Sequence, residues 1–247
     1  MSKLIEIPNL PQGRINGIIC GTDDESILDY FKINNISVLR NEANTDIDPS
    51  VASHADMAVL HLGGDKIIAD KGQDKLKNEL KNLGFTVYET KERIKGEYPK
   101  DIKLNFAVIG DYSIGNYNYC DENLKQKLSD KKQINVKQGY SKCSILIVDE
   151  KSAITDDTSI YKALVKNGFD ALLISKGDIS LKGHGYGFIG GASGKITKDT
   201  VLFFGDISTH RDFEEIKEFL ACHNCSFICS DNGPLRDIGG IIPIFEE

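Results

Sequence analysis

Two histidine-bearing segments of the sequence could carry out acid–base chemistry. His54-Ala-Asp56 places an imidazole two residues away from a carboxylate. The histidine could transfer a proton while the carboxylate binds a cationic group, or the pair could simply bind water where a strand begins. His184 lies in Lys182-Gly-His-Gly-Tyr-Gly187, whose three glycines allow either close approach of the backbone to a ligand or a sharp bend.

The six cysteines supply candidate nucleophiles and candidate metal ligands. Zinc favours sulfur and imidazole ligands, so Cys222-His223 followed by Cys225 resembles a metal-binding motif. A second Cys-x-x-Cys pair is missing, and Phe227 to Cys229 is typical of a strand whose alternate residues face opposite ways. We therefore expect neither a metal nor another cofactor, and we treat Cys225 only as a candidate reactive thiol.

A glycine-rich segment, Gly190-Gly-Ala-Ser-Gly194-Lys195, invites comparison with a phosphate-binding loop. That loop requires a glycine where this chain has Ile189, and a serine or threonine where it has Ile196. The segment is therefore interpreted as the turn of a hairpin.

A unit that recurs about five times must position these residues. Each copy has a strand, a glycine-rich turn, a second strand, an amphipathic helix and a closing strand. The clearest copies are residues 54–88 and 140–173, with helices expected over 71–83 and 158–167. A repeat of this length determines the architecture before any single residue is considered.

The other copies are more divergent. The first lacks a clear hairpin, and the fifth is expected to open with a strand at 187–189, with a capping box formed by Thr209 and Asp212 before its helix. The C-terminal segment Ile238–Pro243 looks like the strand Ile15–Ile19. We expect it to complete the first unit, which would remove a sheet edge and make residues 1–247 one domain.

This order of elements resembles the pentein fold, a five-fold pseudosymmetric α/β propeller of ββαβ units closed by the C-terminal strand. The superfamily includes guanidino-group modifying enzymes such as arginine and agmatine deiminases and amidinotransferases, and a non-catalytic ribosome anti-association factor. In its enzymes, a histidine and carboxylates surround the guanidinium, and a cysteine on the last, glycine-rich strand attacks the central carbon. The resemblance covers nearly the whole chain and rests on architecture.

The chain departs from that resemblance at the nucleophile. When Ile238-Gly-Gly-Ile-Ile-Pro243 is laid on the family's last strand, the cysteine position falls at or near Pro243, and no cysteine follows Cys229. His54 and Asp56 also lie in the second copy, earlier than the family's catalytic histidine. The resemblance therefore does not imply that this chain uses the family's covalent mechanism.

The resemblance also implies which residues line the axial pocket, because the beginnings of the opening strands converge on the propeller axis. The candidate catalytic residues are His54, Asp56, His184 and Cys143, the last being the thiol nearest the expected axis. The candidate ligand-binding residues are Asn16, Asn105, Lys142, Tyr186, Arg236 and Asp237, and Arg14, Lys103 and Tyr140 occupy equivalent positions. This combination of acidic, basic and neutral polar side chains suits a small polar or zwitterionic ligand. Alternatively, the charged side chains could pair with one another around a water-filled channel.

Composition excludes several classes of partner. The formal net charge of −7 over 247 residues argues against a nucleic-acid binder, which would normally present a basic surface. No apolar run is long enough to cross a membrane, and the N-terminal residues do not resemble an export signal. We expect a cytoplasmic protein with reduced cysteines.

Three functions fit the sequence. The first is a small-molecule-binding protein with an axial polar pocket and without the covalent cysteine chemistry of the pentein enzymes. The second is a hydrolase or amidinotransferase acting on a guanidino or amidino compound, with Cys143 or Cys225 replacing the missing nucleophile. The third is a non-catalytic ribosome- or protein-associated factor, against which the acidic charge counts. A homodimer is left open, and fold alone cannot choose among these functions.

Overall fold

The computed structural model describes residues 2–247, which form a mixed α/β fold with five small sheets. In four of the sheets an antiparallel pair is followed by a parallel third strand. Their strands are β4 (Val59–Gly63), β5 (Lys66–Ala69) and β6 (Thr86–Glu89); β7 (Ala107–Ile109), β8 (Tyr112–Gly115) and β9 (Lys132–Asn135); β10 (Ile145–Ile147), β11 (Ser152–Thr155) and β12 (Asp170–Leu173); β13 (Ser193–Thr197), β14 (Thr200–Phe203) and β15 (Ser226–Cys229).

The remaining sheet combines both ends of the chain. Its strands are β1 (Lys3–Leu4), β16 (Ile242–Glu246), β2 (Ile15–Ile19) and β3 (Ser37–Leu39), in that order. β16 lies antiparallel to β2, and β3 lies parallel to β2, so the first sheet has the same pattern as the other four. No sheet closes on itself, and closure of a ring by the C-terminal strand remains a prediction.

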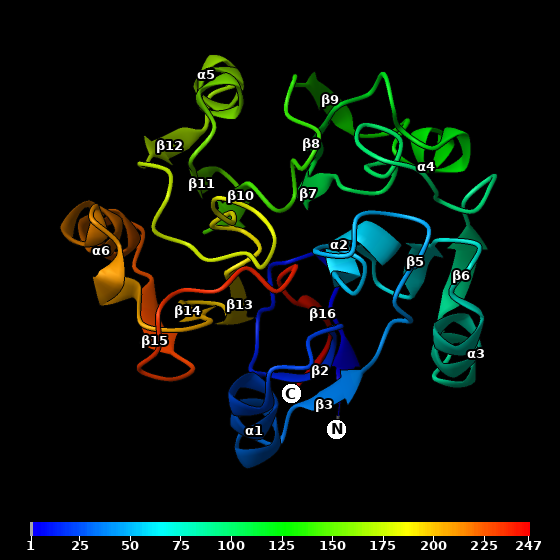
Figure 1. Cartoon of the computed structure of the whole chain (residues 1–247), viewed down its shortest axis with the longest axis horizontal. Coiled ribbons are helices and arrows are strands. Elements are labelled where there is room, and N and C mark those ends of the chain that lie inside the picture. The colour runs from blue at the N-terminus through cyan, green and yellow to red at the C-terminus, as the bar shows by residue number, and fades with distance from the viewer. Residues whose placement is uncertain (1) are drawn as a thin grey trace.

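In each sheet one helix connects the two parallel strands. Figure 1 shows these five helices at the outside of the molecule, with the strands toward its middle. They are α1 (Glu25–Ile33), α3 (Asp74–Asn82), α4 (Glu122–Lys127), α5 (Thr158–Lys166) and α6 (Phe213–Cys222). Two shorter pieces, the helix α2 (Ala55–Ala58) and the 3₁₀ helix η1 (Ile207–Thr209), complete the regular structure.

The apolar spacing of the helices explains how they pack. In α3, Leu76 and Leu80 are fully buried one turn apart, as Ile160 and Leu164 are in α5. Leu83, expected in the same stripe, lies beyond the end of α3 as its C-cap and is 48% exposed. Gly84 follows with φ of +93°, the left-handed conformation that ends a helix at little cost for glycine.

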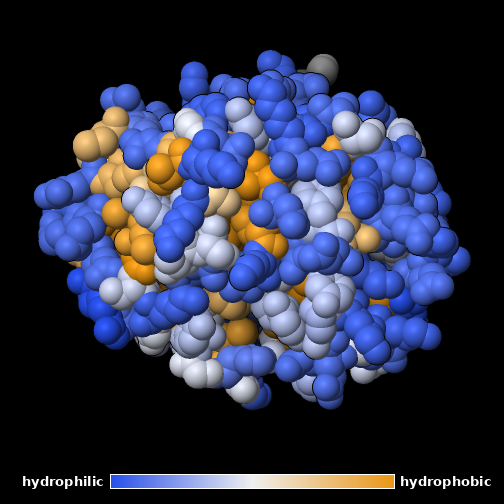
Figure 2. Space-filling view, turned by 90° about the horizontal axis from the view of Figure 1, so that it is seen from above, coloured by the Kyte–Doolittle hydropathy of each residue, from blue (hydrophilic) through white to orange (hydrophobic). Residues whose placement is uncertain are grey.

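The hydrophobic core lies between neighbouring sheets. One cluster joins Leu146 and Ile154 of the β10–β12 sheet to Val201 and Phe203 of the β13–β15 sheet. Another joins Ile19 and Ile244 of the first sheet to residues of the β4–β6 sheet. The outer surface is different: Figure 2 shows a face that is mostly hydrophilic, with separate apolar areas. No helix among residues 2–247 is long and apolar enough to cross a membrane.

The opening of the fifth unit was predicted wrongly. The strand expected at 187–189 is β13 (Ser193–Thr197), and the hairpin turn lies between Thr197 and Thr200 rather than at Gly190–Gly194. The cause is Asp237, whose carboxylate accepts the Phe188 N–H at 2.9 Å. A Cβ on Gly191 would lie 1.9 Å from Asp237 Oδ1, so this glycine-rich segment packs against a buried carboxylate instead of pairing in a sheet.

Three other boundaries also differ from expectation. The copy 54–88 was expected to open with a strand, but Ala55–Ala58 forms the helix α2 and the strand begins at Val59. The C-terminal strand starts at Ile242 because Gly239 and Gly240 adopt positive φ of 76° and 64° and turn the chain. The capping box does not form, because the Asp212 side chain accepts the backbone N–H of Ser175 and makes no bond to its own helix.

We expect the substitution Ile244→Ala in β16 to lower the free energy of unfolding by about 2–5 kcal/mol. Ile244 is fully buried in the cluster between the first sheet and the β4–β6 sheet, so the shorter side chain leaves a cavity where both ends of the chain meet. Urea unfolding followed by circular dichroism measures the change. Ile33→Ala is the control, because Ile33 is 78% exposed, and equal effects of the two substitutions would contradict this account of the core.

Candidate functional site

Six polar residues from four separate segments meet in the interior. Each is at most 7% exposed, although none belongs to a strand. His54 and Asp56 come from the start of α2, and the others come from segments that precede β7, β10 and β16. We call His54, Asp56, Asn105, Lys142, Cys143 and Asp237 the central cluster.

Cys143 both donates and accepts a hydrogen bond within this cluster. Its thiol donates to Asp56 Oδ2 at 2.9 Å, and Asn105 Nδ2 donates to its sulfur at 3.1 Å. Asn105 Oδ1 in turn accepts the backbone N–H of Lys142 at 2.8 Å. The amide of Asn105 therefore fixes both the sulfur and the main chain that carries it.

Burial keeps the Cys143 sulfur protonated. Desolvation raises the pKa of Cys143 well above its ordinary value, and the nearby carboxylates of Asp56 and Asp237 raise it further. Desolvation also raises the pKa of Asp56, against the opposing charges of His54 and Lys142. Because the thiolate is the reactive form, this direction of the pKa opposes activation of Cys143 as a nucleophile.

Asp237 joins the histidine of the cluster to two loops. Its Oδ1 lies 3.8 Å from His54 Nδ1 and accepts the Gly239 N–H at 3.0 Å, while Oδ2 accepts the Phe188 N–H. A Cβ on Gly239 would lie 2.4 Å from the Cβ of His54. Only glycine allows the backbone to pass this close to the histidine with a positive φ.

Several polar groups of the cluster form no hydrogen bond within the protein. Asp56 Oδ1 and His54 Nδ1 are buried without a hydrogen bond. Within residues 2–247, Lys142 Nζ forms no ion pair within 4.0 Å and no hydrogen bond, although the residue is 7% exposed. Buried polar groups are normally paired, so Asp56 Oδ1 and His54 Nδ1 are positions where a bound molecule or water would supply the missing hydrogen bonds.

Two cavities have walls in common, and the residues that line them do not include the six of the central cluster. The larger, of about 710 Å³, and the smaller, of about 170 Å³, share Tyr140 and His184 in their walls. Phe188 lines the smaller cavity and donates its N–H to Asp237. Leu181 lines it too and packs with Met57 in the apolar cluster around Tyr140. The segment 181–188 therefore lies between these cavities and the central cluster.

The structure places four of the expected site residues outside the cluster. His184 is 3.4 Å from Asp48, measured between Nε2 and Oδ2, and with Tyr186 it lines the smaller cavity. Asn16 lies in β2 and donates to Ser2 Oγ at 2.9 Å. Arg236, although next to Asp237, faces α1 instead of the interior.

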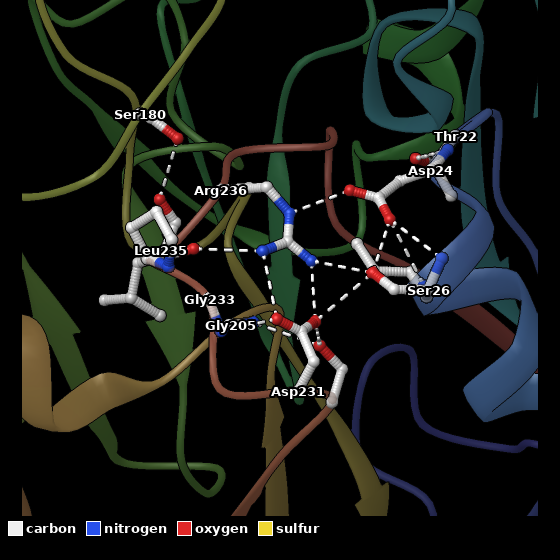
Figure 3. Close-up of polar contacts among 12 residues, drawn as sticks. Thr22, Asp24, Ser26, Ser180, Gly205, Asp231, Gly233, Leu235 and Arg236 are labelled. Carbon is white, nitrogen blue, oxygen red and sulfur yellow. Dashed lines mark hydrogen bonds and ion pairs between the residues drawn. The ribbon is translucent and has the colours of Figure 1, made fainter.

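Figure 3 shows how Arg236 is held. Its Nη2 donates to Asp231 Oδ2 at 2.6 Å and to Ser26 Oγ at 3.2 Å, and its Nε lies 2.8 Å from Asp24 Oδ2. The hydrogen bond from Arg236 lowers the pKa of Asp231, which keeps that carboxylate charged. These contacts attach the segment before β16 to the N-terminus of α1 and occupy the guanidinium with acceptors of the protein itself.

The other sequence candidates also lie apart from the cluster. Cys225 is buried in the apolar cluster beside the fifth sheet, with its sulfur 3.6 Å from Lys195 Nζ. Pro243, at the expected nucleophile position, lies in β16 and lines a cavity of only about 10 Å³ together with Lys142. In the part of the chain that the structure describes, no group of three or more His, Cys, Asp or Glu side chains could hold a metal ion.

Sequence reasoning missed several residues around the larger cavity. Asp46, Asp48 and Tyr98 lie in residues 41–50 and 89–100, two stretches between copies of the unit that contributed no candidate to the sequence analysis. Phe188 was missed as a partner of Asp237 because it was expected in a strand. Residues in irregular loops have no periodic pattern, so no sequence signal could have identified them.

Comparison with known proteins places the chain in a family. A model described as a family of unknown function, DUF6873, matches residues 18–242. The chain belongs to this family. No curated protein matches the DUF6873 chain.

Solved structures similar to the DUF6873 chain share its architecture over nearly its whole length. An inosamine-phosphate amidinotransferase of Streptomyces griseus matches with a TM-score of 0.60 at 11% identity, covering 98% of this chain and 97% of that one. An agmatine deiminase of C. jejuni gives 0.55 at 13%, covering 95% and 94%. A DDAH of Pseudomonas aeruginosa complexed with citrulline gives 0.57 at 12%, covering 92% and 96%. These likenesses confirm the fold of the pentein superfamily.

We expect Cys143 to resist alkylation by iodoacetamide in the folded protein at pH 7–8. Its raised pKa leaves almost no thiolate in that range, so reaction should begin only as the pH rises above about 9 or when the protein unfolds. Peptide mass spectrometry measures the modified fraction with time. The exposed Cys222 is the internal control, and modification of Cys143 as fast as Cys222 at pH 7 would show that its sulfur is ionised and accessible.

Proposed function

We propose that this protein binds a small polar molecule at the central cluster and does not use the covalent cysteine chemistry of the pentein enzymes. The observation that carries the proposal is that two buried atoms of the cluster, Asp56 Oδ1 and His54 Nδ1, form no hydrogen bond, beside the ammonium group of Lys142. A protein interior that leaves such groups unpaired loses stability, whereas a ligand with matching donors and acceptors recovers it.

The charges of these groups indicate the kind of ligand. Asp56 and Asp237 favour a cationic group with N–H donors, such as a guanidinium, an amidinium or an ammonium. Lys142 favours an anionic or carbonyl oxygen. A small zwitterion or a guanidino compound satisfies both requirements. Several similar structures point the same way, since they are of an amidinotransferase, an agmatine deiminase and a DDAH complexed with citrulline.

Two observations favour binding over covalent catalysis. The raised pKa of Cys143 keeps its thiol protonated, and that thiol already donates its hydrogen to Asp56. At the position of the superfamily's nucleophile, the last strand carries Ile242 and Pro243, neither of which can attack a substrate.

The proposal also covers the arrangement of the sheets, the number of domains and the location of the protein. We infer that the five sheets form a five-fold propeller, that β16 closes it by completing the first sheet, and that residues 1–247 form one domain. The protein would act in the cytoplasm on a small molecule and not on nucleic acid, in keeping with its net charge of −7. A homodimer remains compatible with this organisation.

A ligand screen tests the binding function. We expect at least one member of a panel of amino acids, guanidino and amidino compounds, including agmatine and citrulline, to raise the melting temperature of the protein. Isothermal titration calorimetry should then give an affinity that Asp56→Asn weakens about 10–100-fold, because a charge-assisted hydrogen bond to the ligand is lost.

The control for that titration is Asp170→Asn, because Asp170 is an exposed aspartate whose carboxylate pairs with His223 away from the cluster. It should bind the same ligand as tightly as the unchanged protein. Equal affinities of the Asp56→Asn variant and the unchanged protein, or a panel with no ligand at all, would refute binding at the cluster.

A second candidate function is hydrolysis or amidine transfer on a guanidino or amidino compound, with Cys143 as the nucleophile. The specific observation in its favour is the 2.9 Å contact between the thiol and Asp56 Oδ2, which gives the thiol proton a carboxylate to move to. In this scheme a bound cation between Asp56 and Asp237 would also favour the thiolate by charge.

Turnover decides between the two functions. Release of ammonia, urea or citrulline from the same panel should not exceed the background rate if the protein only binds. If turnover is found, Cys143→Ser should reduce kcat by more than about 100-fold, and Cys222→Ser should leave it unchanged. Turnover that depends on Cys143 would overturn the binding-only proposal.

A further inference from the structure

The larger of the two cavities has a lining that differs from that of the central cluster. Its volume of about 710 Å³ lies in the usual range for small-molecule sites. It is formed mainly by the segments 45–49 and 96–98, together with Gln138, Tyr140 and His184. Three carboxylates line it, those of Asp46, Asp48 and Glu97, and no lysine or arginine does.

Aromatic rings run along this cavity and into the smaller one. The ring centroids of Tyr98 and Tyr140 are 5.3 Å apart, those of Tyr140 and Phe188 are 6.0 Å apart, and those of Phe188 and Tyr186 are 5.9 Å apart. Tyr98 is 51% exposed, which is unusual for a ring that the fold holds in place. Aromatic faces carry partial negative charge and attract cations.

The two tyrosines at the start of this row are fixed before any ligand arrives. A Cβ on Gly139 would lie 2.5 Å from Tyr98 Cε2, so the Tyr98 ring packs directly against that backbone. The Tyr140 hydroxyl donates to the buried Asp101 Oδ2 at 2.7 Å. The rings therefore lose little conformational freedom when a ligand binds between them and the acidic segment.

Two of the three carboxylates already have protein partners, whereas the Glu97 side chain has none among residues 2–247. Asp48 Oδ1 accepts from the backbone N–H and the hydroxyl of Ser50, and its Oδ2 faces His184. The hydrogen bonds from Ser50 also lower the pKa of Asp48, which keeps it ionised. Asp46 Oδ2 lies 3.1 Å from Arg93 Nε. A guanidinium or a primary ammonium needs several acceptors, whereas an alkylated ammonium needs only negative charge and apolar contact.

We propose that this cavity is a binding site for a tertiary or quaternary alkylammonium group, held against Tyr98 and Tyr140 in the field of Asp46, Asp48 and Glu97. The site is separate from the central cluster and does not rest on the function proposed for that cluster. Its ligand is a small organic cation whose methyl groups pack on the aromatic rings.

The test uses choline and tetramethylammonium as probes, titrated into the full chain by calorimetry. We expect both to bind, and we expect 3,3-dimethylbutanol, the uncharged carbon analogue of choline, to bind at least about 5-fold more weakly. Guanidine hydrochloride is the competing cation at equal ionic strength. Binding of guanidine as tight as that of tetramethylammonium would overturn the assignment of ligand class.

Four variants locate the site. Tyr98→Leu should weaken choline binding at least about 5-fold, and Tyr98→Phe, which keeps the ring, should not. Tyr119→Leu is the matched control, since Tyr119 is 43% exposed and does not line the cavity. Asp56→Asn should leave choline binding unchanged, which separates this site from the central cluster. Absence of choline binding, or equal loss in the Tyr98→Leu and Tyr119→Leu variants, would refute the proposal.

Discussion

The arrangement of the interior depends on one buried carboxylate, that of Asp237. It is 6% exposed and accepts backbone N–H groups from Phe188 and Gly239, which lie on either side of it in the sequence. It also faces the imidazole of His54 from the second unit. Because a buried charge is stable only when its surroundings supply hydrogen bonds, this side chain constrains the loops that surround it. The glycines at 191 and 239 follow from the same constraint, since a side chain at either position would collide with the pair.

The polar interior and the apolar clusters have different roles. The apolar clusters lie between neighbouring sheets and hold them together without any need for precise geometry. The central cluster contributes little to that packing and keeps a protonated thiol, a carboxylate with an unused oxygen and an unpaired ammonium group close together. Proteins usually retain polar groups that cost stability where they serve recognition or chemistry.

Much of the fold could be predicted from the sequence, because hydrophobic periodicity records it directly. The buried pairs Leu76 with Leu80 and Ile160 with Leu164 indicated their helices, and the order of strands and helices indicated the pentein fold. The convergence of strand beginnings brought Asp56, Asn105, Lys142 and Cys143 into consideration, and these do lie together. Arg236 and Asn16 met the same criterion but face other partners, since a position in sequence does not fix the direction of a side chain. The segment 187–192 could not be predicted, because its conformation depends on a carboxylate almost fifty residues away.

The sheet that combines both ends of the chain has a consequence for folding. Ile15 pairs with Glu246, and Ile19 pairs with Ile242, so the first sheet cannot be completed until residues 242–246 have been synthesised. The other four sheets contain only strands that are close in sequence, and they can form in order as the chain emerges. Contacts of such high sequence separation slow folding, because a long loop must close before they contribute any stability. Until then one edge of β2 has unpaired backbone groups. The edge is covered only when β16 folds back against β2.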